Sequence, residues 1–87
     1  MDGKARVAWN LRRHRVAAGV SQETLATDAG VDRTFVGRIE RGLENPTVGI
    51  LDRLAEALGI DVAEFLTKPR PGERRPKPLK AGRKPAR

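Results

Sequence analysis

The chain has 87 residues, of which 38% are hydrophobic, and this size allows one small domain with a modest core. It contains no cysteine, which excludes a disulfide framework, a thiolate zinc site and a cysteine nucleophile. No apolar stretch approaches the roughly 20 residues that span a bilayer, and the N-terminus lacks the apolar segment of a signal peptide. We therefore expect a soluble cytoplasmic protein with no membrane partner.

The formal net charge of +7 is distributed unevenly along the chain. Residues 1–67 hold 9 basic residues against 10 acidic ones, whereas residues 68–87 hold 9 basic residues against Glu73 alone. Residues 68–87 also contain five of the six prolines and one large aliphatic residue, Leu79. Such a segment cannot bury enough apolar surface to fold alone. The sequence therefore predicts a folded domain over residues 1–67 and a disordered basic tail over residues 68–87.

Helical periodicity in residues 1–67 predicts five helices and no strand. Four patterns each end at a glycine, and each glycine is soon followed by a residue that caps the next helix: Ser21, Asp32, Thr47 and Asp61. The expected ranges are about 4–18, 22–29 and 33–41, then a helix after Thr47 and a short one ending near Leu66. The apolar faces of the first and fourth helices are expected to contain Val7, Ala8, Leu11, Ala18, Val48, Leu51, Leu54, Ala55 and Leu58.

The second and third expected helices have the spacing of a helix-turn-helix, because only Ala29-Gly30-Val31 separates them. Ala26 is small enough for the two helices to cross closely, and Gly30 can adopt the left-handed conformation of a tight turn. The residues expected to face inward are Leu25, Val31, Val36 and Ile39. The residues left outside, where a DNA major groove could receive them, are Gln22, Arg33, Thr34 and Arg38.

These motifs resemble the lambda-repressor-like DNA-binding domain of Cro-type (XRE) regulators over roughly residues 4–67. The resemblance is carried by Ser21-Gln22, Leu25-Ala26, Ala29-Gly30-Val31, VGRIERG at 36–42 and Asn45-Pro46-Thr47. It implies a compact all-α, five-helix domain whose third helix enters the major groove, with base contacts from Arg33, Thr34 and Arg38. It also implies contacts to the DNA backbone from Gln22, Arg41, Asn45 and Thr47. The alternatives are a solvated helix face for Arg33 and Arg38, ordinary polarity at a helix N-terminus for Gln22, and turn or cap roles for Arg41, Asn45 and Thr47.

Two residues depart from what such domains usually contain. Phe35 stands where a tyrosine is frequent, so it either contacts a thymine methyl group or covers the helix. Gly37 lies inside the recognition helix, where glycine costs roughly 1 kcal/mol relative to alanine. Its presence indicates either a close backbone approach or the absence of a side-chain contact at that position.

Two further positions concern the stability of the domain. Arg15 and Glu40 stand where similar domains form an ion pair between the first helix and the end of the recognition helix. The alternative is two exposed charges. His14 falls where such domains often have an aliphatic residue, so we expect it to be a half-buried packing residue. As the only histidine, it cannot build a histidine cluster for a metal.

The resemblance favours a sequence-specific transcriptional regulator that binds double-stranded DNA as a homodimer on a palindromic operator. Its half-sites would lie about 34 Å apart. Candidate dimer contacts are Val62, Phe65 and Leu66, and the alternative places some of them in the monomer core. A phage-type repressor, a restriction-modification controller and an antitoxin-type regulator all remain open.

A second class is a general nucleic-acid-binding or partner-recruiting protein that acts through its tail. The residues expected to make non-specific contacts are Arg74, Arg75, Lys77, Lys80, Arg83 and Lys84. An enzyme is the weakest class, because the chain has one serine, no tyrosine and no phosphate-binding glycine loop. We expect no metal, no cofactor and no small-molecule effector.

Overall fold

The computed structural model describes residues 1–70 and residue 72, and the fold of these residues is all-helical. The elements are α1 (Gly3–Ala18), α2 (Gln22–Ala29), α3 (Arg33–Glu40), α4 (Val48–Leu58) and the 3-10 helix η1 (Val62–Leu66). The all-α prediction is confirmed. The fifth expected element is a 3-10 helix of five residues, because so short a run favours i to i+3 hydrogen bonds. The tail contacts predicted at Arg74, Arg75, Lys77, Lys80, Arg83 and Lys84 lie outside the described residues.

Each element begins at a side chain that accepts a hydrogen bond from an otherwise free backbone N–H. At the start of α2, Ser21 Oγ accepts from the N–H of Thr24 at 2.9 Å. Asp32 Oδ1 accepts from the N–H of Thr34 at 2.8 Å and thereby opens α3. The same kind of bond opens the other elements at Asp2, Thr47 and Asp61. The four caps predicted from the sequence are therefore confirmed.

A single hydrophobic core joins all five elements. Its buried members are Val7, Leu11, Leu25, Ala26, Ala29, Val36, Ile39, Leu51, Leu54, Ala55 and Phe65. Two residues expected on the apolar faces are exposed instead: Ala18, and Val48, which is 70% exposed. They lie in the last turn of α1 and the first turn of α4, so the core ends before it reaches them.

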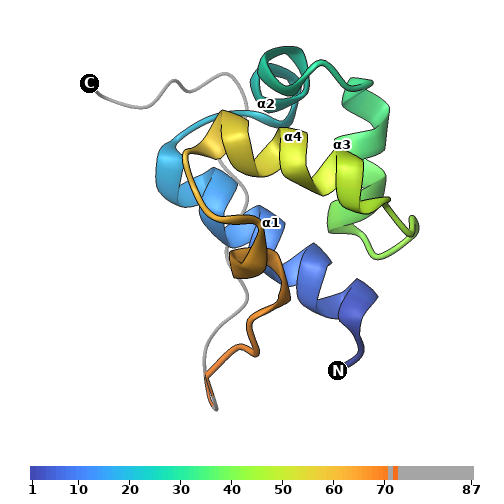
Figure 1. Cartoon of the computed structure of the whole chain (residues 1–87), viewed down its shortest axis with the longest axis vertical. Helices are drawn as coiled ribbons and strands as arrows, with labels where there is room; N and C mark the ends of the chain where they lie inside the picture. Colours follow the sequence, from blue (N-terminus) through green and yellow to red (C-terminus); the bar gives the residue numbers. More distant parts are fainter. Residues whose placement is uncertain (71, 73–87) are drawn as a thin grey trace.

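The arrangement of the helices leaves one side of the helix-turn-helix open. In Figure 1, α4 crosses the middle of the molecule, α2 and α3 lie above it and to its right, and α1 runs below with η1 beside it. The strongest contacts join α1 to η1 and α2 to α3, while α4 packs against α2. The C-terminal half of the domain therefore supports the helix-turn-helix from one side and α1 supports it from another.

The segment that follows η1 is attached to α1 through its backbone. Asn10 is fully buried, and its Nδ2 donates to the carbonyl oxygens of Phe65 and Thr67 at 3.1 and 2.8 Å. Arg6 Nη1 donates to the carbonyl oxygen of Leu66 at 3.2 Å. These bonds fix the path of the chain as far as residue 67. Within the described part of the chain, no helix is both long enough and apolar enough to cross a membrane.

Candidate nucleic-acid interface

The turn between α2 and α3 fixes the angle at which these two helices cross. Gly30 has φ 72° and ψ 34°, a left-handed conformation that glycine adopts without steric cost. The N–H of Val31 then donates to the carbonyl oxygen of Ala26 at 2.9 Å, which closes the C-terminal cap of α2. Ala26 itself is only 1% exposed, so the two helices approach closely at this point. The predicted roles of Ala26 and Gly30 are confirmed.

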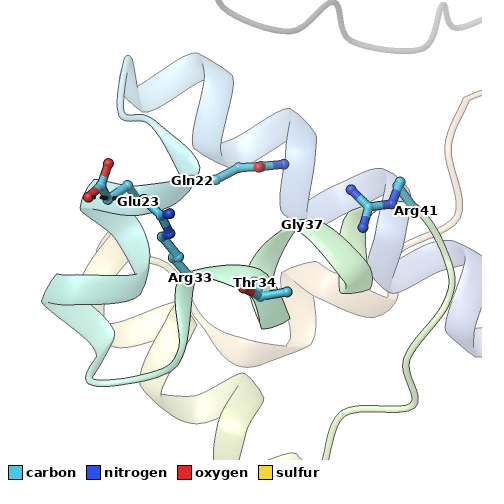
Figure 2. A pocket seen from close by; sticks show the side chains of 6 residues that line it. All are labelled: Gln22, Glu23, Arg33, Thr34, Gly37 and Arg41. Atoms are coloured by element: carbon cyan, nitrogen blue, oxygen red, sulfur yellow. Dashed lines mark ion pairs between the residues drawn. The ribbon is translucent and has the colours of Figure 1, made fainter.

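An open pocket of about 300 Å³ lies between the first turn of α2 and the exposed side of α3. Figure 2 shows the residues that line it: Gln22, Glu23, Arg33, Thr34, Gly37 and Arg41. Gln22 extends from α2 across Gly37 towards Arg41, which follows the last residue of α3. Four of the residues assigned to DNA from the sequence are thus brought to one surface.

Gly37 has a side-chain explanation rather than a backbone one. A Cβ at this position would lie 3.3 Å from Gln22 Oε1 and 3.4 Å from Arg41 Nη1, both of which are tight contacts. The expected close backbone approach is therefore wrong, because the groups that pass over Gly37 are the ends of two side chains. The missing Cβ leaves room for the ends of the Gln22 and Arg41 side chains above α3.

Arg33 and Thr34 are exposed at the N-terminal end of α3. Arg33 Nη1 lies 3.5 Å from Glu23 Oε2, and the two side chains are 69% and 70% exposed. An ion pair so open to solvent is worth little, so Arg33 can exchange Glu23 for another acceptor at small cost. Neither residue is held by a packing role that would compete with DNA contact.

Arg38 is held differently from Arg33. Its Nε donates to Glu44 Oε2 at 2.6 Å, and the side chains are 43% and 31% exposed. This bond turns Arg38 towards the loop that follows α3, and Glu44 was not singled out from the sequence. A base contact by Arg38 must therefore use its terminal nitrogens or displace Glu44.

The other residues expected to contact the DNA backbone differ in exposure and in the hydrogen bonds that already hold them. Arg41 and Asn45 are exposed in the loop after α3. Thr47 Oγ1 accepts from the N–H of Ile50 at 3.1 Å, so Thr47 caps α4. Gln22 is half-buried, and its Nε2 donates to Glu40 Oε1 at 3.1 Å. The carboxylate of Glu40, the last residue of α3, therefore orients the amide of Gln22.

Burial distinguishes between the alternative roles of Phe35 and of the three candidate dimer contacts. Phe35 is half-buried and packs against the core, which favours the helix-covering role. Phe65 is 0% exposed, so it is a monomer core residue, and its proposed dimer contact is wrong. Val62 is half-buried, and Leu66 is 49% exposed. Leu66 is thus the most accessible of the three dimer candidates.

Arg15 and Glu40 form a buried ion pair at the base of the interface. Arg15 Nε lies 2.6 Å from Glu40 Oε2, and Arg15 Nη2 lies 2.9 Å from Glu40 Oε1. Arg15 Nη1 donates to the carbonyl oxygen of Val20 at 2.9 Å. Arg12 adds a further bond, from its Nε to Glu40 Oε1 at 3.2 Å. Arg12 was not singled out from the sequence, although its place three residues before Arg15 puts both on one helix face.

His14 lies at the contact between α1 and η1, away from the pocket. Its ring meets Phe65 edge to face at a centroid distance of 6.4 Å, and its Nε2 is 3.7 Å from Glu64 Oε1. Burial lowers the pKa of His14 below its ordinary 6.5, Arg13 lowers it further, and Glu64 opposes the shift. His14 is thus a half-buried packing residue, as predicted. Among the described residues, no group of three or more acidic or histidine side chains could hold a metal ion.

The crossing of α2 and α3 over a shared core, with arginines on the open side, defines a helix-turn-helix protein. Residues 11–65 match the model of the helix-turn-helix family HTH_3, a range that is more than half of the chain. The chain belongs to this family. It is an XRE-type helix-turn-helix transcriptional regulator, and the family predicted from the motifs is confirmed.

Named relatives share both sequence and fold with this chain. A hypothetical transcription factor of Neisseria meningitidis serogroup B is 40% identical over 68 residues, which are 78% of this chain and 64% of that protein. The chain therefore spans slightly less than two thirds of that relative's length. The restriction-modification controller C.AhdI of Aeromonas hydrophila is 42% identical, with a TM-score of 0.69 over 71% of this chain and 94% of the controller. A structure of C.Esp1396I bound to a 25 base pair operator site is 28% identical, with a TM-score of 0.68 over 75% of this chain and 86% of that one.

Proposed function

We propose that this protein regulates transcription by binding a specific double-stranded DNA operator through the open side of α2 and α3. One observation carries the proposal: the pocket gathers two arginines, Gln22 and Thr34 where the start of α2 faces α3, and its one acidic residue, Glu23, is only loosely paired with Arg33. The partial positive charge of a helix N-terminus adds to this attraction for an anionic backbone. The operator complex of C.Esp1396I, a relative with the same fold, supports DNA as the partner.

Within this surface, Arg33, Thr34 and Arg38 read bases, while Gln22, Arg41 and Asn45 contact phosphates. An arginine can donate two bonds to guanine O6 and N7, and such a pair discriminates against other bases by about 1–3 kcal/mol. The exposed, weakly paired Arg33 is the strongest of these assignments. Arg38 contributes less as long as Glu44 holds its Nε.

Selection of bound sites from random duplex DNA, followed by binding assays with variants, tests this proposal. Arg33→Ala should weaken binding to the selected site by about 1–3 kcal/mol and relax the preference at one base position. Arg53→Ala is the matched control, because Arg53 is an exposed arginine on α4 that does not line the pocket, and its one bond, from Nη1 to the carbonyl oxygen of Gly30, is long at 3.4 Å and open to solvent. Equal weakening on all sequences would instead make Arg33 a phosphate contact. Absence of any preferred site for the wild-type protein would refute the proposed function.

Binding as a homodimer is the second part of the proposal. Leu66 is 49% exposed on η1, and Val62 is half-buried beside it, so this edge can bury apolar surface against a second copy. Sedimentation at micromolar concentration should detect a dimer, and Leu66→Glu should dissociate it. Leu43→Glu is the control, because Leu43 is a 53% exposed leucine in the loop after α3. A monomer both alone and on operator DNA would rule out the dimer.

The uneven charge of the chain supports a further role for residues 68–87 as a sequence-independent arm on DNA. Replacing Arg74, Arg75, Lys77, Lys80, Arg83 and Lys84 by glutamine should flatten the dependence of log K on log[salt]. The expected change is about 0.9 for each phosphate that these side chains neutralise, with the site preference retained. Identical slopes for the two proteins would exclude the arm.

The similarity to C.AhdI favours restriction-modification control over the phage and antitoxin contexts. If this context is correct, the selected site should occur in the promoter of a restriction or methyltransferase gene near the gene for this protein. If the selected site does not occur in such a promoter, restriction-modification control is no longer favoured over the phage and antitoxin contexts.

A further inference from the structure

One oxygen of Glu40 receives hydrogen bonds from two different helices. Arg15 Nη2 and Arg12 Nε, both from α1, lie 2.9 and 3.2 Å from Glu40 Oε1. Gln22 Nε2, from the start of α2, lies 3.1 Å from the same oxygen. The Arg12 guanidinium and the Gln22 amide are therefore neighbours around Glu40 Oε1, and of the two only Gln22 lines the pocket.

The cluster carries one positive charge more than its carboxylate neutralises. Every nitrogen of the Arg15 guanidinium has a partner, because its Nε and Nη2 bind Glu40 and its Nη1 binds the carbonyl oxygen of Val20. Its side chain is also only 4% exposed. Arg12 uses its Nε alone, and its side chain is 18% exposed. The excess charge therefore resides on Arg12, whose terminal nitrogens have no partner among the described residues.

A buried carboxylate with a single arginine would complete a neutral pair, so the second arginine has no role in balancing charge. Its guanidinium instead lies beside the Gln22 amide, because both donate to Glu40 Oε1. Glu40 accepts a hydrogen bond from the Nε of Arg12, and this restraint reduces the conformational entropy that Arg12 would lose on binding an anion. Arg12 thus has the charge, the free donors and the fixed orientation that a phosphate contact requires.

We propose that Arg12 is a DNA-backbone contact provided by α1, next to Gln22, and that Glu40 is the residue that positions both. This inference rests on the proposed function, since it adds a contact to the same DNA surface. The DNA backbone would then be held from α1, from the start of α2 and from Arg41 at the end of α3. Arg12 supplies affinity without sequence preference, because phosphates carry no base identity.

The test compares Arg12→Met, Arg12→Lys and the control Arg53→Met on the selected operator and on unrelated duplex DNA between 50 and 200 mM salt. Methionine keeps the apolar stem of Arg12 but removes its charge. Arg12→Met should lower affinity about tenfold on both DNAs and reduce the salt slope by about 0.9. Arg12→Lys should recover the slope, and Arg53→Met should match the wild type.

Circular dichroism at each assay temperature checks that the variants are folded. A constant unfolded fraction lowers the apparent affinity but does not alter the slope, so the slope separates a DNA contact from a structural role. If wild-type protein binds its site and the slope of Arg12→Met is unchanged, the inference about Arg12 is wrong while the proposed function stands. If wild-type protein binds no duplex DNA, both are overturned.

Discussion

Removal of the Glu40 carboxylate should destabilise the whole domain. Glu40 is fully buried, and its two oxygens accept bonds from Arg15, Arg12 and Gln22. In Glu40→Leu, the 4% exposed Arg15 side chain keeps its charge and loses its acceptor. Breaking a buried pair in this way costs about 3–5 kcal/mol. For a domain of this size, that loss lowers Tm by about 12–40 °C, at about 4–8 °C for each kcal/mol.

Thermal and urea unfolding, followed by circular dichroism and by the fluorescence of the single tryptophan, Trp9, would measure this loss. The double variant Arg15→Met, Glu40→Leu should be more stable than Glu40→Leu alone, because it removes both charges and leaves an apolar contact. Glu56→Leu is the control, since Glu56 is an exposed glutamate on α4, and its stability should change by no more than about 0.5 kcal/mol. A Tm of Glu40→Leu equal to that of the wild type would refute the reasoning.

Three further outcomes are expected. Gly37→Ala should raise the free energy of unfolding by up to about 1 kcal/mol through helix propensity, and a lower Tm would contradict this. The same variant should weaken DNA binding, because the new Cβ displaces the side-chain end of Gln22. Asn10→Leu should cost about 1–3 kcal/mol in urea unfolding, since the carbonyl of Phe65 loses a buried donor, and an unchanged midpoint would disprove the role of that bond. The unfolding free energy should also fall as the pH drops below about 6.5 towards the lowered pKa of His14, because the unfolded chain takes up a proton first. The slope is at most about 1.4 kcal/mol per pH unit, and His14→Gln should abolish it.

The helix order, the caps and the inward face of α2 and α3 could be predicted from the sequence, because each depends on local spacing and residue type. The partners of the charged residues could not. Arg38 and Glu44 are six residues apart, and only the loop after α3 brings them together. The choice between core and surface for Phe65 depends on how η1 packs on α1, which local periodicity does not determine.

The distribution of charge along the sequence predicts that residues 68–87 are the main source of sequence-independent attraction to DNA. The structure adds a different source, since two arginines of α1 share one carboxylate and leave a net positive charge on Arg12. A near-neutral domain can thus present a local cation, because its acidic residue is buried beneath the surface. Spacing within α1 could have indicated Arg12, but its partner is 28 residues away.

Both Nδ2 bonds of Asn10 go to backbone carbonyls, and its Oδ1 also accepts a longer bond of 3.4 Å from the hydroxyl of Thr67. Since the two shorter bonds reach only the backbone, the place at which the polypeptide leaves the domain beside α1 depends little on the side chains of this segment. Any segment that follows starts from this anchor, whatever its composition. A tag, fluorescent protein or foreign domain joined after residue 67 should therefore be attached at a fixed position beside α1 and should leave the structure of α2 and α3 unchanged.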